Sequence, residues 1–288
     1  MSVAGSRDRD IEPPGTRVHR ECESLAGVTR GAPPCNGCRV RTVTPCATPA
    51  ATGGTVVPPF RLCEQWFPAG CEIVEQGESG RQFFVVTEGW AVQYELLKNG
   101  GRQILDFLLP GSTAGFHPEG EARSPHFVQT LTGVRACKLS TAGFLRAAKS
   151  NPALALRLAA VASQSHYRSL RRLTLIGRRT ARERVAVLLF ELHRRAQRWS
   201  LSPWEDEIPL PLTQEHIGDA LGLTNVHVNR MLRELREDGV LVLKNGMLRL
   251  LDPGRLAEIA GHEEHRFVRH PPPGASTLRE HRQATALT

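Results

Sequence analysis

The sequence lacks any long apolar segment. Its longest uninterrupted apolar run, Val185–Phe190, has six residues, whereas a helix that spans a bilayer needs about 20. The N-terminal residues include acidic side chains and no apolar stretch, so they are not typical of a secretory signal. Both absences predict a cytoplasmic chain with no membrane contact. Thiols stay reduced there, so the seven cysteines are interpreted first as metal ligands, catalytic groups or inert core residues, and only then as disulfides.

Motifs of common enzyme classes are also missing. No Gly-x-Ser-x-Gly nucleophile motif occurs, and no glycine-rich phosphate loop follows a strand and opens a helix. A set made of Cys71 with His117 or His126 remains conceivable as a Cys/His pair. We nevertheless expect a protein that is not an enzyme and has no catalytic residues.

Positive charge is what the chain has in excess, with a net charge of +8 over 288 residues. Residues 151–200 hold eleven Arg against two Glu, so the rest of the chain is close to neutral. A basic surface favours a polyanionic partner such as nucleic acid. The alternative is an Arg-rich helix face that is merely solvated.

The composition changes along the chain and predicts an α+β protein. Short apolar runs separated by glycines at spacings near ten residues predict a β jelly roll (double-stranded β-helix). Asn151 and Pro152 then start a long helix that we expect to end near Gly177. The predicted parts are a flexible cysteine-bearing arm (1–59), a sensor domain (60–150), a dimerisation helix (151–179), a winged helix-turn-helix domain (180–260) and a disordered tail (261–288).

The stretch from Pro209 to Asp252 is the clearest pattern in the chain. Thr213 and Thr224 are suited to cap two short helices, and Gly222 lies in the turn between them. Asn245-Gly246 is a strong signal for a hairpin turn. Two helices joined by a glycine turn and followed by a small hairpin are typical of a winged helix-turn-helix that binds DNA.

The second of these helices has one apolar and one polar face. Its buried stripe is predicted at Val228, Leu232 and Leu235. Arg and Asn side chains on the other face can distinguish guanine and adenine edges, Val226 can contact a thymine methyl group, and Thr224 and His227 are better placed for phosphate. The predicted DNA-binding residues are Thr224, Val226, His227, Asn229, Arg230 and Arg233.

From about residue 60 to 260 the chain resembles the CRP/FNR family of bacterial transcription regulators. The resemblance rests on the glycine-punctuated domain, on TARERVAVLLFELHRR and above all on LTQEHIGDALGLTNVHVNRMLRELREDGVL. It implies a sensor jelly roll, a dimerisation helix and a C-terminal winged helix-turn-helix. It also implies a homodimer on a DNA operator with two-fold symmetry, and RNA polymerase as a partner.

Four cysteines point to the ligand of the sensor. Cys35-x2-Cys38-x7-Cys46 lies in the arm, and Cys137 follows far along the chain. Four soft sulfur ligands suit a [4Fe–4S] cluster or tetrahedral zinc. The arrangement resembles the oxygen-sensing FNR branch of the family, in which three N-terminal cysteines and one from the sensor domain hold a [4Fe–4S] cluster. The resemblance implies that role for Cys35, Cys38, Cys46 and Cys137.

Several alternatives to this cluster remain. Cys22 could replace one ligand, Cys35 and Cys38 could form a redox disulfide, or the cysteines could be incidental; Cys63 and Cys71 are expected as inert buried thiols. A cyclic nucleotide or another small ligand could gate the regulator instead. Arg123-Ser124 matches part of the family's phosphate cassette, but Ala114-Gly115-Phe116 stands where the cassette has Gly-Glu-Leu, so its Glu is missing.

The resemblance suggests how oxygen could control the regulator. The intact cluster would tie the arm to the sensor domain under low oxygen and favour the dimer, and its loss would weaken DNA binding. Arg168 and Arg172 interrupt the apolar seam of the long helix, which we interpret as a marginal dimer interface. The recognition helix has Val226 where the best-known members of the branch have Glu, so we expect a different half-site.

Overall fold

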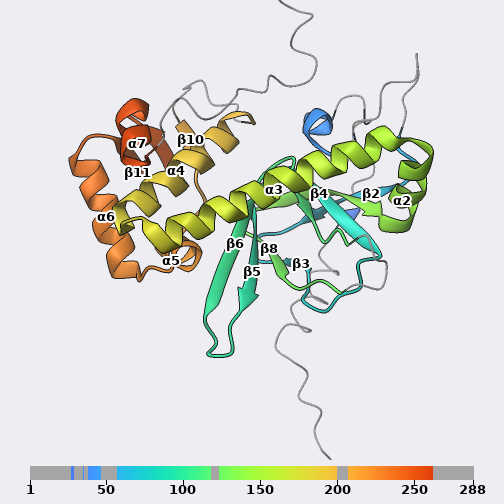
Figure 1. The fold of residues 1–288 in the computed structure, drawn as a ribbon, viewed down its shortest axis with the longest axis horizontal. Helices are drawn as coiled ribbons and strands as arrows, with labels where there is room; N and C mark the ends of the chain where they lie inside the picture. The colour runs from blue at the N-terminus through green and yellow to red at the C-terminus, as the bar shows by residue number, and fades with distance from the viewer. Residues whose placement is uncertain are drawn as a thin grey trace, which may run out of the picture.

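The computed structural model describes residues 27–28, 35, 38–46, 57–117, 123–199 and 207–261. Two antiparallel sheets come first, a long helix follows, and a small domain of helices with a hairpin ends the described chain (Figure 1). The predicted α+β class and the β-sheet sensor domain are confirmed. Most of the predicted arm, and the predicted tail apart from Gly261, lie outside the described residues.

The sensor domain is a sandwich of two sheets with strand orders β1-β2-β9-β4-β7 and β3-β8-β5-β6. Side chains such as Phe84, Val86 and Leu108 fill the space between them. The strands are β1 (Gly27–Val28), β2 (Arg61–Phe67), β3 (Glu72–Val74), β4 (Gln82–Glu88), β5 (Ala91–Leu96), β6 (Arg102–Leu108), β7 (Thr113–Ala114), β8 (Phe127–Thr130) and β9 (Val134–Ser140).

Helices α2 (Thr141–Ser150) and α3 (Pro152–Arg178) follow the sandwich. The side chain of Asn151 accepts a hydrogen bond from the backbone N–H of Ala153, and Pro152 opens the helix, as predicted. Helix α3 passes through Gly177 and ends one residue later, where Arg179 adopts extended backbone. With 27 residues it is about 40 Å long, and it runs from the sensor domain to the C-terminal domain (Figure 1).

The C-terminal domain has the predicted order of helices and hairpin. Thr180, Thr213 and Thr224 each cap the helix that follows, because each side chain accepts a hydrogen bond from a backbone N–H three residues later. Asn245 and Gly246 both have positive φ, as a tight hairpin turn requires. The elements are α4 (Ala181–Gln197), β10 (Glu207–Pro209), α5 (Gln214–Leu221), α6 (Asn225–Glu237), β11 (Leu241–Lys244), β12 (Met247–Leu250) and α7 (Pro253–Ile259).

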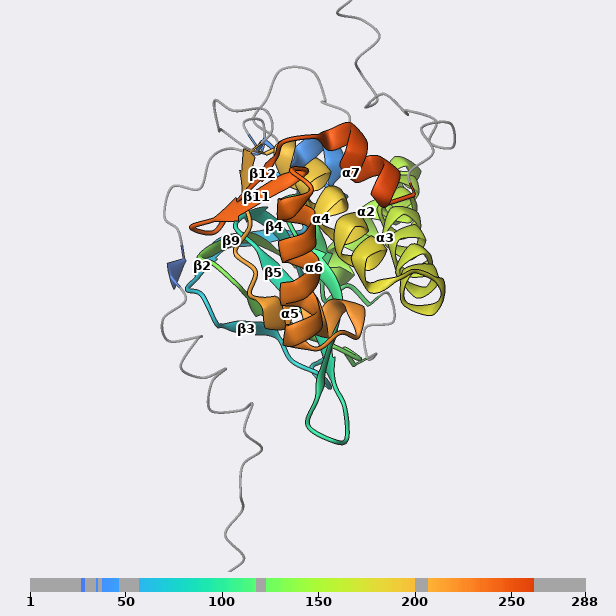
Figure 2. The ribbon, with the colours of Figure 1, turned by 90° about the vertical axis from the view of Figure 1, so that its left-hand side faces the viewer.

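The sensor and C-terminal domains share an interface at the β5–β6 hairpin, which lies beside α5 (Figure 2). Arg102 Nε of β6 lies 2.8 Å from Asp219 Oδ2 of α5, and Gln103 Nε2 donates to the Asp219 carbonyl oxygen at 2.7 Å. One apolar cluster continues from Tyr94 and Phe107 into the C-terminal domain. The position of α5 is therefore linked to the sensor sheets.

None of the described helices combines the length and apolar character that crossing a bilayer requires.

Candidate cysteine cluster and DNA-binding surface

The described part of the arm is folded against the sensor domain. Residues 38–46 form successive turns around a short 3-10 helix, η2 (Arg41–Val43). Val40 is buried in a cluster with Phe60, Phe83 and Leu139. Gly111 has φ +90°, and a Cβ there would lie 2.8 Å from Val43 Cγ2, so the arm closely contacts the loop before β7. Part of the predicted coreless arm therefore does share a core with the sensor domain.

Strand β9 presents Cys137 to this arm. Side chains alternate along a strand, so Val134 and Ala136 face the space between the sheets, while Cys137 and Leu139 face outward. The outward face is covered by the arm and α2, and Cys137 is only 8% exposed. The strand therefore aims the predicted fourth cysteine at the segment that carries the other three.

The four predicted ligands come together. Cys35, Cys38 and Cys137 line one cavity of about 130 Å³, and Cys46 is close enough to all three for their charges to affect it. Burial raises the pKa of Cys46 to about 12 and that of Cys137 to about 11, and neighbouring cysteines add to both increases. Soft donors from two distant segments thus meet at one place.

The state of the described cysteines bears on two of the alternatives. Cys35, Cys38, Cys46, Cys63 and Cys137 are free thiols, so the predicted alternative of a Cys35–Cys38 disulfide is not formed. Cys63 is partly buried, whereas Cys71 is disulfide-bonded, so the expectation of an inert thiol at Cys71 was wrong. A Cys/His pair based on the Cys71 thiolate is therefore not formed either. Cys22 lies outside the described residues.

Arg61 is a feature of this site that sequence reasoning missed. Its guanidinium donates from Nη1 to Cys35 Sγ at 3.4 Å and lines one cavity with Cys137, which is close enough to affect its pKa. These sulfurs and burial act in opposite directions on the pKa of Arg61, and the net effect is an increase. No local pattern marks this residue, because its two partners lie 26 residues before it and on a neighbouring strand.

The remnant of the phosphate cassette is engaged within the protein. Phe116 packs edge-on against Phe83 and Phe144, with ring centroids 5.0 and 5.8 Å apart. Arg123 Nη1 donates to the Gly77 carbonyl oxygen at 2.8 Å, and Ser124 Oγ donates to the His126 carbonyl oxygen at 2.8 Å. These three side chains therefore make their contacts within the sensor domain, in its core and between its loops.

Helix α6 has the two faces that the sequence predicts. Val228, Leu232 and Leu235 are buried, and Val226 is 78% exposed. Thr224 Oγ1 accepts from the His227 backbone N–H at 3.3 Å and lies 3.0 Å from His227 Nδ1. All six predicted DNA-binding residues, Thr224, Val226, His227, Asn229, Arg230 and Arg233, are exposed.

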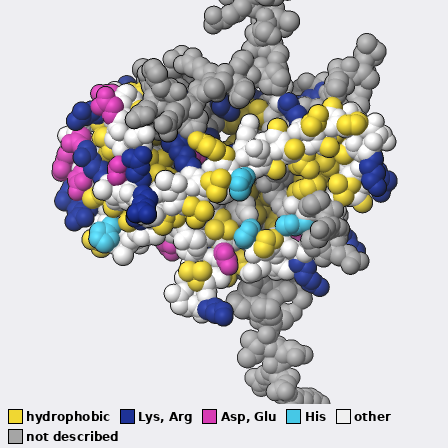
Figure 3. Space-filling model, viewed as in Figure 1, with side chains coloured by type: hydrophobic (Ala, Val, Ile, Leu, Met, Phe, Trp, Pro, Cys, Tyr) yellow, Lys and Arg dark blue, Asp and Glu magenta, His cyan; other side chains and the backbone are white. Residues whose placement is uncertain are grey.

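Residues of α5 and α6 together form a shallow surface. Gln214, Asn225, Val226, Asn229, Arg230 and Arg233 line an open hollow of about 440 Å³. Gln214 and Asn225 were not predicted; each directly follows a capping threonine, which is the signal that could have found them. At the end of the molecule that carries these helices, basic side chains alternate with acidic ones (Figure 3), and Arg230 and Arg233 lie 3.8 and 3.7 Å from Glu234 and Glu237.

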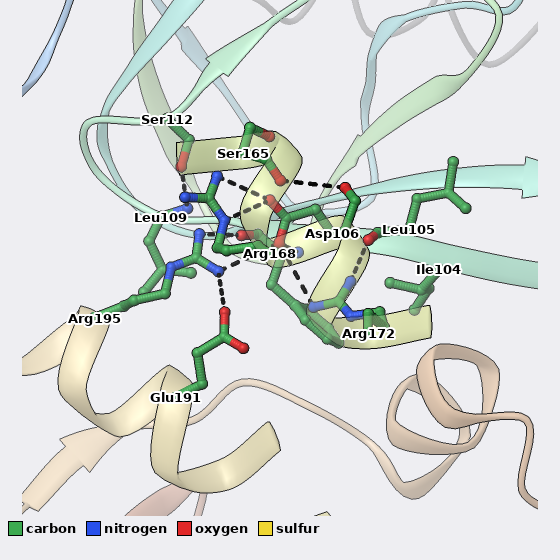
Figure 4. A network of polar contacts seen from close by, with 12 residues as sticks. Ile104, Leu105, Asp106, Leu109, Ser112, Ser165, Arg168, Arg172, Glu191 and Arg195 are labelled. Carbon is green, nitrogen blue, oxygen red and sulfur yellow. Dashed lines mark hydrogen bonds and ion pairs between the residues drawn. The ribbon is translucent and has the colours of Figure 1, made fainter. Parts of the chain in front are cut away.

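A third group of polar residues joins the domains around Asp106 of β6 (Figure 4). Its carboxylate lies 3.3 Å from Arg168, 3.6 Å from Arg172 and 3.3 Å from Arg195. Burial alone raises the pKa of Asp106, but Arg195, Arg168 and Arg172 together hold it below its usual value. Arg195 Nη2 also donates to the Phe107 carbonyl oxygen at 2.6 Å.

This network corrects the prediction for the long helix. Arg168 and Arg172 are not uncompensated like charges along the helix, because both bind Asp106 of their own chain. The exposed large apolar residues of α3 are Leu156, Tyr167, Leu170 and Leu173.

Comparison with known proteins agrees with the fold and places α5 and α6 in a helix-turn-helix domain. Residues 64–151 match the cyclic nucleotide-binding domain, and residues 183–259 match the Crp-like helix-turn-helix domain. The nitrogen fixation regulation protein FixK of Bradyrhizobium diazoefficiens is 32% identical over 67% of this chain and 80% of its own length. The fumarate and nitrate reduction regulatory protein of Escherichia coli is 26% identical over 67% of this chain and 76% of its own length.

A solved structure gives the same result. FixK2 from Bradyrhizobium japonicum superposes with a TM-score of 0.62 at 28% identity, covering 68% of this chain and 96% of that one. The chain is therefore a DNA-binding transcription regulator and belongs to the CRP/FNR family.

Proposed function

We propose that this regulator senses oxygen or redox state through a [4Fe–4S] cluster bound by Cys35, Cys38, Cys46 and Cys137, and controls genes needed under low oxygen. The observation that carries the proposal is the convergence of four free cysteines from the arm and β9. The resemblance of this cysteine pattern to the FNR branch supports it. So does the similarity to the fumarate and nitrate reduction regulatory protein.

The chemistry of the donors fits the cluster. Among the described residues, no three His, Cys, Asp or Glu side chains are grouped as one metal ion requires. A [4Fe–4S] cluster binds each of its four thiolates at a different iron, and four cysteines can supply these thiolates. When bound, the cluster supplies an oxygen-sensitive link between the arm and β9.

Contacts of the arm carry this link to the long helix. Arg157 of α3 donates from Nε to the Thr44 carbonyl oxygen at 3.4 Å, between Cys38 and Cys46 in sequence. Val43 lines a cavity together with Val161 and Arg168 of the same helix. Holding Cys38 and Cys46 in place therefore also holds the arm on α3, and releasing them removes contacts from one side of that helix.

The exposed apolar side chains of α3 provide the face for a homodimer. Leu156 and Leu173 are 73% and 67% exposed, and burying such side chains favours association. A symmetric dimer would place two α6 helices about 34 Å apart, one DNA turn, on an operator with two-fold symmetry. RNA polymerase is the further partner that the family resemblance implies.

The exposed face of α6 would read the operator. Asn229, Arg230 and Arg233 supply donors for base edges, and Val226 supplies an apolar surface for a thymine methyl group. Thr224 and His227 lie at the N-terminus of the helix, where phosphate is favoured. A protein that neutralises several phosphates should lose operator affinity steeply as salt rises.

The test is the visible absorption spectrum of protein purified without oxygen, followed through exposure to air, with iron and sulfide measured on the same sample. We expect a cluster spectrum that bleaches in air and operator binding that falls with it. Protein without iron or sulfide that still binds the operator in response to a cyclic nucleotide would replace this proposal with gating by a small ligand.

A further inference from the structure

Arg61 lies where the arm meets the sensor sheet. It begins β2 and pairs with Leu139 of β9, two residues beyond Cys137. Its guanidinium donates to Cys35 Sγ of the arm at 3.4 Å, and it lines one cavity with Cys137 of the strand, which is close enough to affect its pKa. Arg61 Nε is buried and has no hydrogen-bond partner among the described residues.

The charge of Arg61 has no carboxylate partner within the described chain. The other charged side chains lining the same cavity include Arg39, Glu64, Glu88 and Arg135. Arg135 and Glu88 pair with each other at 3.3 Å, and Glu64 accepts from Thr87 Oγ1 at 3.3 Å. None of the described carboxylates forms an ion pair with Arg61, so a partly buried guanidinium faces two sulfurs.

Neutral thiols are poor partners for such a group. A thiol sulfur accepts hydrogen bonds weakly, whereas a rigid guanidinium fork is suited to bridging two anionic acceptors. Thiolates bound to iron are anionic, and a [4Fe–4S] core with four thiolates keeps a net negative charge. The cavity therefore has its unmatched positive charge where a cysteine-bound cluster would have negative charge.

We propose that Arg61 is a positioning residue for the cluster, which orients Cys35 and Cys137 toward one another and balances the charge of their thiolates. The proposal rests on the proposed function, because it needs the cluster to be bound. A nearby cation stabilises the more negative, reduced form of a cluster, and hydrogen bonds to its sulfurs act in the same direction. Arg61 should therefore raise the reduction potential and the affinity for iron.

The experiment compares Arg61→Gln and Arg61→Lys with the wild-type protein and with Arg135→Gln. Arg135 is the matched control, since it lines the same cavity but pairs with Glu88. Each protein is reconstituted without oxygen using ferrous iron and sulfide. Iron and sulfide per chain are measured as functions of added iron, and the midpoint potential of the loaded cluster is measured by dye-mediated titration.

For Arg61→Gln we expect roughly 10-fold weaker iron loading, the range found when a group supporting metal ligands is removed, and a lower midpoint potential. Arg61→Lys should recover part of the iron loading and part of the midpoint potential, and Arg135→Gln should match the wild-type protein in both. A wild-type midpoint potential and wild-type iron loading in Arg61→Gln would overturn the role of Arg61 but leave the proposed function standing. A wild-type chain that takes up no iron and sulfide would overturn the proposed function and this inference together.

Circular dichroism and melting temperature check each variant. If Arg61→Gln does not fold, Arg61→Lys decides the question, because lysine keeps the charge but cannot bridge two sulfurs with a planar fork. A partly lowered affinity for iron in that variant supports the inference, and wild-type loading and potential overturn it.

Discussion

The cysteine site and the recognition helix are held in place by different means. Helix α6 has a cap, a complete buried stripe and a hairpin packed behind it, all within about 40 residues of chain. The cysteine site joins an arm to a strand about 100 residues later, and Val40 and Pro45 are the buried apolar side chains of the arm within 38–46. The first region has a core of its own, whereas the second, in the proposed function, also depends on what its sulfurs bind. This is the division that a sensor coupled to a DNA-binding domain requires.

The largest expected effect comes from removing one of the cysteine ligands. Cys38→Ala should abolish iron binding and operator binding together, because the arm loses a ligand, while the fold of the C-terminal domain is unchanged. Iron analysis and operator binding without oxygen measure both effects. Cys63→Ala is the control, a free cysteine outside the site. Full oxygen-responsive binding by Cys38→Ala would contradict the proposed mechanism.

The second prediction concerns the junction between the regions. Asp106→Asn removes the anion that three arginines share, and breaking a buried pair costs about 3–5 kcal/mol. Because the folded-state pKa of Asp106 is lowered, its stabilising effect is present above the unfolded pKa and is lost as pH falls through the folded value. Chemical unfolding at neutral and acid pH checks this.

The difference between variant and wild type should shrink at acid pH. Glu258→Gln on α7 provides a control, since its ion pair with Arg255 is exposed. An equal loss of stability at both pH values would show that Asp106 acts without its charge.

The third prediction disrupts the recognition helix without touching the cysteines. Leu232→Ala should lower the free energy of unfolding by about 2–5 kcal/mol, because Leu232 is buried in the C-terminal core. Val226→Ala on the same helix should change it by less than about 0.5 kcal/mol, since Val226 is exposed. Thermal unfolding and iron content are measured together. Loss of iron in Leu232→Ala would show that the two regions are less independent than described.

The smallest expected effect concerns reading of the operator. Arg230→Ala should remove about 1–3 kcal/mol of discrimination at one base position, because a paired donor is lost. Iron content and stability should stay the same. Arg255→Ala on α7 is the matched control. Competition binding with operators changed at single positions measures the effect, and equal discrimination in both variants would exclude Arg230 as a base-reading residue.

The sequence predicted the two regions with unequal completeness, for a physical reason. The elements around α6 follow from local rules, since Thr224, Gly222 and Asn245-Gly246 act on backbone a few residues away. The order of the elements and the exposed face of the recognition helix were predicted on that basis. The grouping of Cys35, Cys38, Cys46 and Cys137 came instead from a family resemblance, because no local pattern relates positions 100 residues apart.

Interactions between distant segments explain what the sequence did not predict. The arginines of α3 look like a weak seam when the helix is considered alone, but Asp106 on β6 provides the partner that a helical pattern cannot reveal. Arg61 was missed for the same reason, since its partners lie in the arm and on the strand beside it.

The β5–β6 hairpin has a mechanical consequence for this regulator. Arg102 forms an ion pair with the Asp219 side chain, and Gln103 donates a hydrogen bond to the Asp219 carbonyl oxygen. These contacts connect the sensor sheets directly to α5, the first helix of the helix-turn-helix. A displacement in the sandwich thus reaches α5 by a short path as well as along the length of α3. Because both linkages reach the same pair of helices, any change in the position of that pair has to be accommodated by both of them.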